Sequence, residues 1–222
     1  MFRNDEARFA WVREHLYVPV VCDVLDGMGF RDQAMHHRLR PLDSGNCVFV
    51  GRARTLRWME TDYVVEGDPY GLEIEAMDSL RPGDVVVHST DHAETNAPWG
   101  ELMSTVAKAR GAAGCICDSQ IRDCLRIMAL RFPVFYRGIR PVDSMGRGRL
   151  MAYDVPVRCG EVLVHPGDLI FADFDGIVVV PREVEDAVLQ KAAEKAGKES
   201  ASRAELAQGK SLREVYDKYG VL

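Results

Sequence analysis

Hydrophobic residues recur at two different spacings along this chain, and segments of the two kinds alternate. Near the N-terminus apolar residues recur every three or four positions, which predicts two helices within about residues 4–28. The same period returns over about residues 183–207, where we expect a long amphipathic helix. Shorter helices are predicted at 72–77 and at 101–110, the second of which ends at Gly111.

Short, continuous apolar runs between these helices are typical of buried strands. They occupy residues 47–56, 85–87, 113–117, 132–136, 169–172 and 177–180. Residues 154–164 are expected to form a hairpin or a bent strand. The runs 85–87 and 169–172 each follow a Pro-Gly-Asp turn, which would fit two related β-halves. Because no linker separates the helices from the strands, the pattern predicts a single α/β domain over residues 1–222.

Length and composition narrow the class of protein. A chain of 222 residues that is 47% hydrophobic can bury one sizeable core. The formal net charge is −6, whereas proteins that bind nucleic acids usually carry an excess of basic residues. We therefore expect no nucleic-acid partner. No apolar run reaches the length of a membrane span, and the N-terminus lacks the pattern of a signal peptide. We therefore expect a cytoplasmic protein without a membrane partner.

Neither the cysteines nor the histidines follow a metal-binding pattern. The six cysteines form no C-x-x-C pair, and we expect them to be small buried hydrophobic residues. The histidines without metal-ligand spacing are expected at surfaces or turns: His36, His37, His88, His92 and His165. The basic segments 137–140 and 147–149 are expected to be solvated loops, although an anionic substrate could use them.

The predicted helix start at Trp99-Gly100-Glu101 is suited to an anion. No Ser, Thr, Asp or Asn immediately precedes it, so its first N–H groups lack an obvious side-chain cap. Gly100 lets a ligand approach the backbone closely. Free amides at the positive end of a helix bind carboxylates. The alternative is an ordinary helix start with hydrated amides.

Arg122 and Asp123 follow the next predicted strand. Arginine can bind a carboxylate through two parallel hydrogen bonds, and aspartate can hold a hard divalent cation. Asp118, expected at the end of that strand, could orient Arg122 or serve in the outer shell of a metal. The alternative is a surface ion pair with Asp123 as the cap of a short helix. Together with the helix start, these residues predict a site for a small metal-chelating acid, such as a 2-oxo acid.

The combination of these motifs resembles the RraA-like family, which includes 4-hydroxy-4-methyl-2-oxoglutarate aldolases and regulators of ribonuclease activity. The matching segments are 23–26, 99–102, 110–114, Asp118, 122–123, 167–168, 172–181 and 219–222. The resemblance implies a β/β/α layered sandwich. It also implies a homotrimer or a homohexamer with active sites between subunits.

The resemblance further assigns roles to single residues. The amides that would hold the substrate carboxylate are those of Gly100, Glu101, Leu102 and Met103. Arg122 would contact the substrate, and Asp123 would bind Mg²⁺ or Mn²⁺. A glutamate from the C-terminal helix of a neighbouring subunit would reach the metal through water. Glu199 is the best match for it, and Glu194 is the second.

The implied activity is that of a divalent-metal-dependent lyase. It would cleave a C–C bond of a small 2-oxo acid to give pyruvate, either as an aldolase or as an oxaloacetate decarboxylase. Both reactions pass through the same enolate, so the sequence does not separate them. Ser119 stands where the family usually has glycine, which could alter the substrate.

Two other functions compete with the lyase. One is a non-catalytic, protein-binding regulator of the ribonuclease-regulator type. The other is menaquinone-linked methyl transfer, which we disfavour because no glycine-rich motif follows the first strand.

Overall fold

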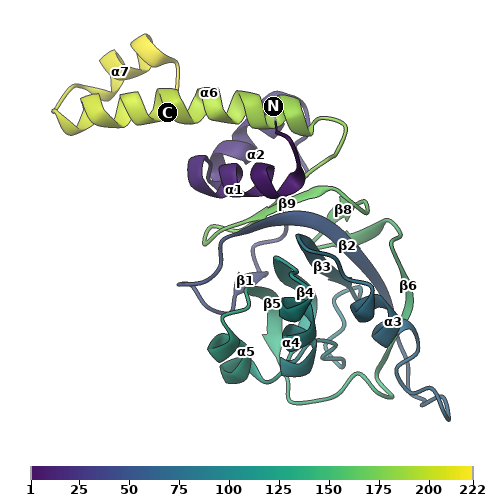
Figure 1. The fold of residues 1–222 in the computed structure, drawn as a ribbon. Helices are drawn as coiled ribbons and strands as arrows, with labels where there is room; N and C mark the ends of the chain where they lie inside the picture. The colour runs from purple at the N-terminus through teal and green to yellow at the C-terminus, as the bar shows by residue number, and fades with distance from the viewer. Residues whose placement is uncertain (1, 222) are drawn as a thin grey trace.

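The computed structural model describes residues 2–221 and shows an α/β protein built on one mixed sheet (Figure 1). Met1 and Leu222, the ends of the predicted domain, lie outside the described residues. The strands are β1 (Arg40–Pro41), β2 (Phe49–Glu60), β3 (Asp84–Ser89), β4 (Gly114–Ile121), β5 (Val134–Ile139), β6 (Gly148–Tyr153), β7 (Val157–Cys159), β8 (Val162–Val164), β9 (Leu169–Ala172) and β10 (Ile177–Val180). The eight-stranded sheet has the order β1-β5-β4-β3-β2-β9-β10, and β6 pairs with β2.

Helices cover two separate parts of this curled sheet (Figure 1). They are α1 (Asp5–His15), α2 (Val18–Gly27), α3 (Leu72–Asp78), α4 (Glu101–Ala109), α5 (Cys124–Leu130), α6 (Glu185–Ala207) and α7 (Leu212–Tyr219). The helices α1, α2 and α6 pack on β9 and β10. The helices α3, α4 and α5 pack on β3, β4 and β5. The hairpin β7–β8 packs against the other face of the sheet. The layers are therefore β/β/α, as the resemblance to the RraA-like family implies.

The alternation of side chains along each strand explains these layers. Val85 and Val87 of β3 face the hairpin, while Val86 between them packs with α3, α4 and α5. In the same way, Phe171 of β9 and Val178 of β10 pack with α1, α2 and α6. Because both faces of these strands are buried, their sequences are continuous apolar runs.

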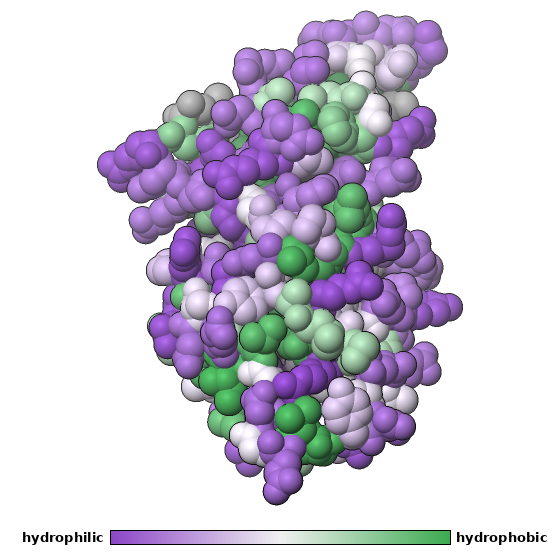
Figure 2. All heavy atoms as spheres, turned by 90° about the vertical axis from the view of Figure 1, so that its right-hand side faces the viewer, coloured by the Kyte–Doolittle hydropathy of each residue, from purple (hydrophilic) through white to green (hydrophobic). Residues whose placement is uncertain are grey.

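The two helical regions also differ in surface character. Figure 2 shows mainly hydrophilic residues over the upper part of the molecule, which contains α1, α2, α6 and α7. Hydrophobic groups are more frequent over the lower part of this view. The exposed hydrophobic side chains of β2, α3 and β6 include Met59, Ile74 and Met151. Within residues 2–221, no helix has both the length and the apolar character needed to cross a membrane.

Most predicted elements lie close to their expected positions. The helices α1 and α2 occupy the predicted range 4–28, and α6 occupies most of the range 183–207. The helix α4 begins at Glu101 as predicted, and Gly111 beyond its end has a positive φ of 79°. The predicted hairpin is formed by β7 and β8.

Other predictions are wrong. The strand expected at 113–117 continues to Ile121, so Asp118 lies inside it. Most of the basic segment 137–140 belongs to β5, and residues 148–149 belong to β6, rather than to solvated loops. These strands carry polar side chains, so a continuous apolar run does not mark them. The helix α7 was not expected either.

The two Pro-Gly-Asp turns lie on opposite sides of β2. The amide of Arg52 donates to the carbonyl of Gly83 at 2.9 Å, and the amide of Gly167 donates to the carbonyl of Ala53 at 2.9 Å. However, β3 runs parallel to β2 and β9 runs antiparallel to it. The two turn-and-strand units are therefore not equivalent, which argues against the expected pair of related β-halves.

Candidate active site

The residues predicted from the helix start, except Glu101, meet those of the Arg-Asp pair in one cavity of about 270 Å³. Gly100, Leu102 and Met103 line it from the start of α4, and Arg122 and Asp123 line it from the segment between β4 and α5. The two segments are joined by the backbone, because the amide of Arg122 donates to the carbonyl of Trp99 at 2.9 Å. A second cavity of about 450 Å³ shares Arg122 and Asp123 with the first and is also lined by residues 124–126 of α5.

The start of α4 has free hydrogen-bond donors. Gly100 occupies the N-cap position in an extended conformation and provides no side-chain cap. Within residues 2–221, the amides of Leu102 and Met103 have no acceptor. The amide of Glu101 donates to Oδ2 of Asp123 at 3.2 Å. A carboxylate ligand would satisfy the remaining donors at the positive end of the helix.

Gly100 is required by the close approach of Arg122 and Asp123. A Cβ atom at this position would lie 2.8 Å from Oδ2 of Asp123 and 3.1 Å from Cγ of Arg122. Any other residue would therefore push the arginine and the aspartate away from the helix start.

Asp123 has a left-handed backbone conformation, with φ of 60°. It stands at the N-cap position of α5, but its side chain accepts no capping hydrogen bond there. The side chain of Asp123 therefore does not cap α5, although it lies within ion-pair distance of Arg122, as the alternative of a surface ion pair expects. A non-glycine residue held in this conformation carries strain that the surrounding structure must offset, and such residues often occur at functional sites.

The charges around Arg122 are only loosely paired. Its Nε atom lies 3.8 Å from Oδ2 of Asp123, and its Nη2 atom lies 3.3 Å from Oδ1 of Asp143. The side chains of Arg122 and Asp123 are 36% and 42% exposed. Asp143 also accepts a hydrogen bond from the hydroxyl of Tyr70 at 3.1 Å, which raises the pKa of that hydroxyl. The guanidinium is thus oriented by carboxylates but keeps donors for a ligand.

Glu73, which the sequence analysis missed, lines the same cavity. It is 3% exposed, and its Oε2 atom accepts a hydrogen bond from the hydroxyl of Ser144 at 3.3 Å. Burial raises the pKa of Glu73 to about 7. Helical spacing could have revealed it, because Glu73 lies three and four positions before the buried residues Ala76 and Met77.

Asp118 does not reach this cavity. Its Oδ1 atom accepts hydrogen bonds from the amide and the hydroxyl of Thr90, at 2.8 and 2.7 Å, and burial raises its pKa. No hydrogen bond or ion pair links it to Arg122 within the described part of the chain, so the expected orienting role is not seen. Ser119 also lies in β4 and needs no positive φ. Its hydroxyl lies 2.6 Å from the carbonyl of Ala93 and 2.7 Å from that of Asn96, and so holds the loop before α4.

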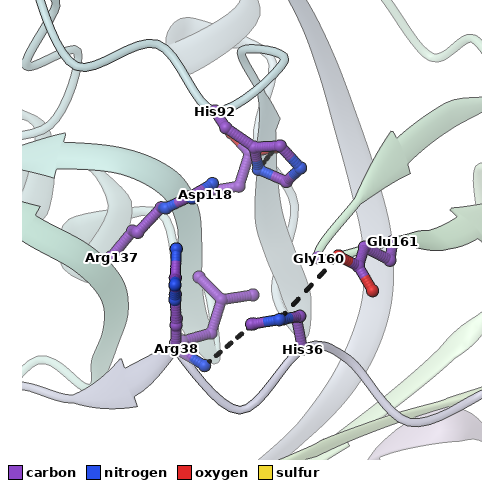
Figure 3. Close-up of a pocket in the computed structure, with 8 residues that line it drawn as sticks. His36, Arg38, His92, Asp118, Arg137, Gly160 and Glu161 are labelled. Atoms are coloured by element: carbon purple, nitrogen blue, oxygen red, sulfur yellow. Dashed lines mark hydrogen bonds and ion pairs between the residues drawn. The ribbon is translucent and has the colours of Figure 1, made fainter.

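Asp118 instead lines a separate polar cavity of about 170 Å³ (Figure 3). Its other lining residues are His36, Arg38, Leu39, His92, Arg137, Gly160 and Glu161. The cavity contains none of the residues that the RraA-like resemblance singles out apart from Asp118. It has no helix start among its lining residues, so it offers a less complete site for a 2-oxo acid.

His88 contradicts the expectation of a surface or turn histidine. It is 1% exposed in β3, and its Nδ1 atom accepts a hydrogen bond from Nε1 of Trp58 at 2.9 Å. Its ring also meets that of Trp99 edge-on, at 5.3 Å between centroids. Burial lowers the pKa of His88 to about 3, so the ring is neutral and acts as part of the core beneath the site.

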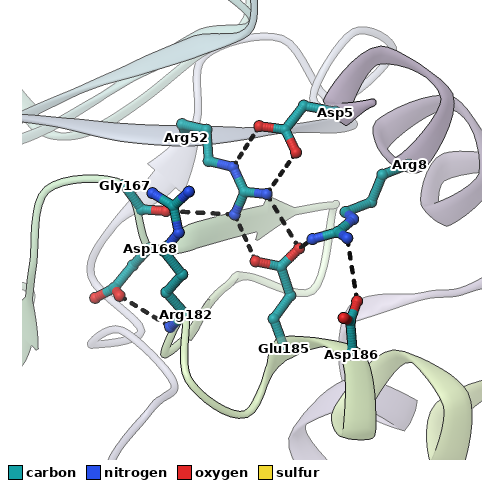
Figure 4. Close-up of polar contacts among 8 residues, drawn as sticks. All are labelled: Asp5, Arg8, Arg52, Gly167, Asp168, Arg182, Glu185 and Asp186. Carbon is teal, nitrogen blue, oxygen red and sulfur yellow. Dashed lines mark hydrogen bonds and ion pairs between the residues drawn. The ribbon is translucent and has the colours of Figure 1, made fainter. Parts of the chain in front are cut away.

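A third group of charged residues joins the two parts of the molecule (Figure 4). Arg52 of β2 binds Asp5 of α1 through Nε at 2.7 Å and through Nη2 at 2.6 Å. It also binds Glu185 at the start of α6, which in turn pairs with Arg8. Because the charged groups of this cluster satisfy one another, we assign it to stability rather than to ligand binding.

Glu199 is not close to Arg122 and Asp123 within one chain. It lies on α6, at the opposite end of the molecule from α4 and α5 (Figure 1). Its carboxylate accepts a hydrogen bond from the hydroxyl of Tyr17, and burial raises its pKa. Glu194 lies on the same helix. Either residue could contribute to a site only through a neighbouring subunit, so this role stays a prediction.

The site offers a divalent cation few protein ligands. Within the described residues, no group of three or more His, Cys, Asp or Glu side chains is placed to hold a metal. Asp123 is the half-exposed carboxylate of the cavity wall, and its donor oxygens suit Mg²⁺ or Mn²⁺. Mg²⁺ commonly binds through one or two carboxylates and keeps several waters, so the residues fit a metal that a chelating substrate completes.

Comparison with known proteins agrees with the fold. The model of the RraA-like family, described as Aldolase/RraA, matches residues 18–179. This chain belongs to the RraA-like family. A protein of Halalkalibacterium halodurans named "Putative 4-hydroxy-4-methyl-2-oxoglutarate aldolase" is 35% identical over 199 residues, which cover 89% of each chain.

Solved structures resemble this RraA-like chain over most of its length. The crystal structure of Streptomyces coelicolor RraAS2, described as an unusual member of the RNase ES inhibitor RraA protein family, has a TM-score of 0.79 and 29% identity. It covers 91% of this chain and 98% of its own. An uncharacterized protein of Pseudomonas syringae pv. tomato str. DC3000 has a TM-score of 0.82 and 26% identity, with coverage of 93% and 91%. Relatives of this RraA-like chain thus carry names of both aldolases and regulators.

Proposed function

We propose that this chain is a divalent-metal-dependent lyase that cleaves a C–C bond of a small 2-oxo acid and releases pyruvate. One observation carries the proposal: free helix-start amides, a loosely paired arginine and a half-exposed aspartate converge on a single cavity. The name of the Halalkalibacterium halodurans relative supports the same class of reaction.

The amides of Leu102 and Met103 bind the substrate carboxylate in this proposal, because they have no other acceptor. Arg122 lies beside them and donates to the 2-oxo oxygen, where negative charge develops as the C–C bond breaks. Asp143, which accepts a hydrogen bond from Tyr70, helps to hold the guanidinium in place.

Asp123 would hold the cation, at the edge where the two cavities meet. Bound there, Mg²⁺ or Mn²⁺ would act as a Lewis acid that polarises the 2-oxo group. Gly100 keeps the aspartate and the helix start close enough to share one substrate. Aldol cleavage and decarboxylation of oxaloacetate both fit this arrangement.

A panel of 2-oxo acids tests the proposal. Pyruvate release would be measured with 4-hydroxy-4-methyl-2-oxoglutarate and with oxaloacetate, each with Mg²⁺, with Mn²⁺ and with EDTA. We expect release with either metal and its loss with EDTA. Because oxaloacetate decarboxylates spontaneously in the presence of metals, the matched control is Arg122→Met protein under the same conditions. Wild-type rates no higher than those of the metal ions without protein, with both substrates, would reject the lyase, and equal rates above that level for the two proteins would reject the role of Arg122.

A protein-binding regulator is the second candidate, supported by the likeness to RraAS2. A regulator does not require metal-dependent turnover. Absence of pyruvate release from both substrates, with a folded protein, would favour this alternative.

A further inference from the structure

We infer that Glu73 is the acid–base group of this site, and that it carries the proton between the substrate hydroxyl and the methyl carbon of the product. This inference rests on the proposed lyase function and names the residue that performs its proton transfers.

The position of Glu73 supports this role. It lies on the inner face of α3 and lines the cavity together with Gly100, Arg122 and Asp123. Although it is 3% exposed, no lysine, arginine or histidine forms an ion pair with it within the described chain. Its hydrogen bond from Ser144 measures 3.3 Å, which is long for a bond between two oxygen atoms. A buried carboxyl with so little compensation needs either a proton or a ligand.

The charged groups around Glu73 do not force it into one protonation state. Burial is the main reason for its pKa of about 7, and the negative charge of Asp143 acts in the same direction. The hydrogen bond from Ser144 and the positive charge of Arg122 oppose this rise. Tyr70 and Asp123 are the other titratable groups that line the cavity. A carboxyl that is protonated about half of the time near pH 7 can both accept and donate a proton.

The proton balance closes on this single group during aldol cleavage. The carboxylate of Glu73 takes the proton of the C4 hydroxyl, the C3–C4 bond breaks, and its electron pair moves onto the 2-oxo oxygen to form the enolate. The new carbonyl compound leaves. Glu73 then returns the same proton to C3 of the enolate, which yields pyruvate and restores the carboxylate.

Exchange of the methyl protons of pyruvate isolates the second of these steps. In D₂O with Mg²⁺ and with pyruvate as the one carbonyl compound added, the wild-type protein should replace these protons with deuterium, as followed by proton NMR. Glu73→Gln keeps the shape and can still bond Ser144, but it cannot transfer a proton. We expect the exchange rate to fall at least about a hundredfold, with little change in the KM for pyruvate.

The matched control is Glu75→Gln, on the exposed side of the same helix. It should exchange like the wild type. The wild-type rate should also change with pH around 7, and this inflection should be absent from Glu73→Gln. Thermal unfolding of each variant verifies its fold.

The outcomes separate the two proposals. If the wild type cleaves 2-oxo acids but Glu73→Gln exchanges at the same rate and keeps the inflection, the acid–base role is wrong and the lyase stands. If the wild type neither cleaves these acids nor exchanges the methyl protons, both proposals are rejected. A purely structural role would lower the melting temperature and leave the pH inflection in place.

Discussion

Arg52 and Arg122 both lie beside two carboxylates, yet their surroundings differ. Arg52 joins β2 to α1 and α6, its side chain is 14% exposed, and it binds Asp5 at 2.6 and 2.7 Å (Figure 4). Arg122 has a side chain that is 36% exposed and lies 3.3 and 3.8 Å from its acidic neighbours. The guanidinium of Arg52 donates all its hydrogen bonds within the fold, whereas that of Arg122 retains donors that face a cavity.

This difference separates charges that hold the protein together from charges that are available to a ligand. A buried arginine with satisfied donors contributes to stability, and its removal leaves a carboxylate without a partner. A loosely paired arginine contributes little to folding, since exposed ion pairs are weak. Substitutions at the two positions should therefore affect different measurements.

The largest expected effect is that of Asp123→Asn on turnover. Asparagine tolerates the left-handed conformation of residue 123 but lacks the charge that would hold a cation. Metal-dependent pyruvate release should become undetectable, while the melting temperature changes by no more than a few degrees. Near-normal turnover at saturating Mg²⁺ would show that Asp123 is not the metal ligand.

Arg122→Lys should have the next largest effect. Lysine keeps the positive charge but cannot form two parallel hydrogen bonds, so we expect kcat/KM to fall by about a hundredfold. The free energy of unfolding should change little, because the pairs of Arg122 are long and half-exposed. If kcat/KM stays within a few fold of the wild type, a simple charge suffices at this position.

Arg52→Met should show the opposite behaviour. It leaves Glu185, whose side chain is 2% exposed, with Arg8 as its remaining partner. We expect a loss of about 3–4 kcal/mol in the free energy of unfolding, measured by urea denaturation. The kcat/KM of the folded fraction should stay unchanged. A large loss of kcat/KM without a loss of stability would invalidate the contrast between the two arginines.

The pKa of Glu73 predicts a smaller, pH-dependent effect on stability. The value is about 7 in the folded protein, against an ordinary value of 4.5. Between pH 4.5 and pH 7, Glu73 is ionised in the unfolded chain but still protonated in the folded protein. The free energy of unfolding therefore falls as the pH rises through this range. Glu73→Gln removes this pH dependence. In the absence of metal, it should stabilise the protein at pH 8 more than at pH 4.5, by up to about 3 kcal/mol.

The control for this measurement is Glu75→Gln, on the exposed side of the same helix. An equal effect of Glu73→Gln at pH 4.5 and at pH 8 would mean that Glu73 titrates normally.

The smallest expected signal is recovery of activity in mixed oligomers. In the proposed shared site, Glu199 of one subunit reaches the metal held by Asp123 of another. Mixing inactive Asp123→Asn chains with inactive Glu199→Ala chains should then restore part of the activity once the oligomers exchange subunits. With random mixing, about a quarter of the shared sites would carry both intact residues. Exchange would be confirmed with a tagged chain. Full activity of Glu199→Ala alone, or exchange without recovery, would exclude the shared site.

Structural features that depend on the order of neighbouring residues could be predicted from the sequence. The start of α4 at Glu101 and the absence of a cap follow from the residues just before it. The placement of Arg122 beside that helix start follows from the family resemblance, since the local sequence does not contain the contact. The continuous apolar runs predicted most strands because those strands are buried on both faces.

Features that depend on distant packing were not predictable in this way. His88 is buried because Trp58 and Trp99, from other segments, enclose its ring. Glu73 is buried because Ser144 and its neighbours, about seventy residues away, cover that face of α3. Ile74, the next residue of α3, lies on the other side of the helix and is 58% exposed.

The position of β2 in the interior of the sheet has a consequence for how the chain folds. This strand pairs with β3 and also with β6 and β9, which lie roughly one hundred residues later in the sequence. Forming these ladders requires the closure of long loops, which slows folding. During synthesis, residues 49–52 of β2 keep one edge unpaired until residues 169–172 have left the ribosome. An unpaired strand edge is prone to association with other chains, so this interval is the stage at which the nascent protein most needs protection by a chaperone.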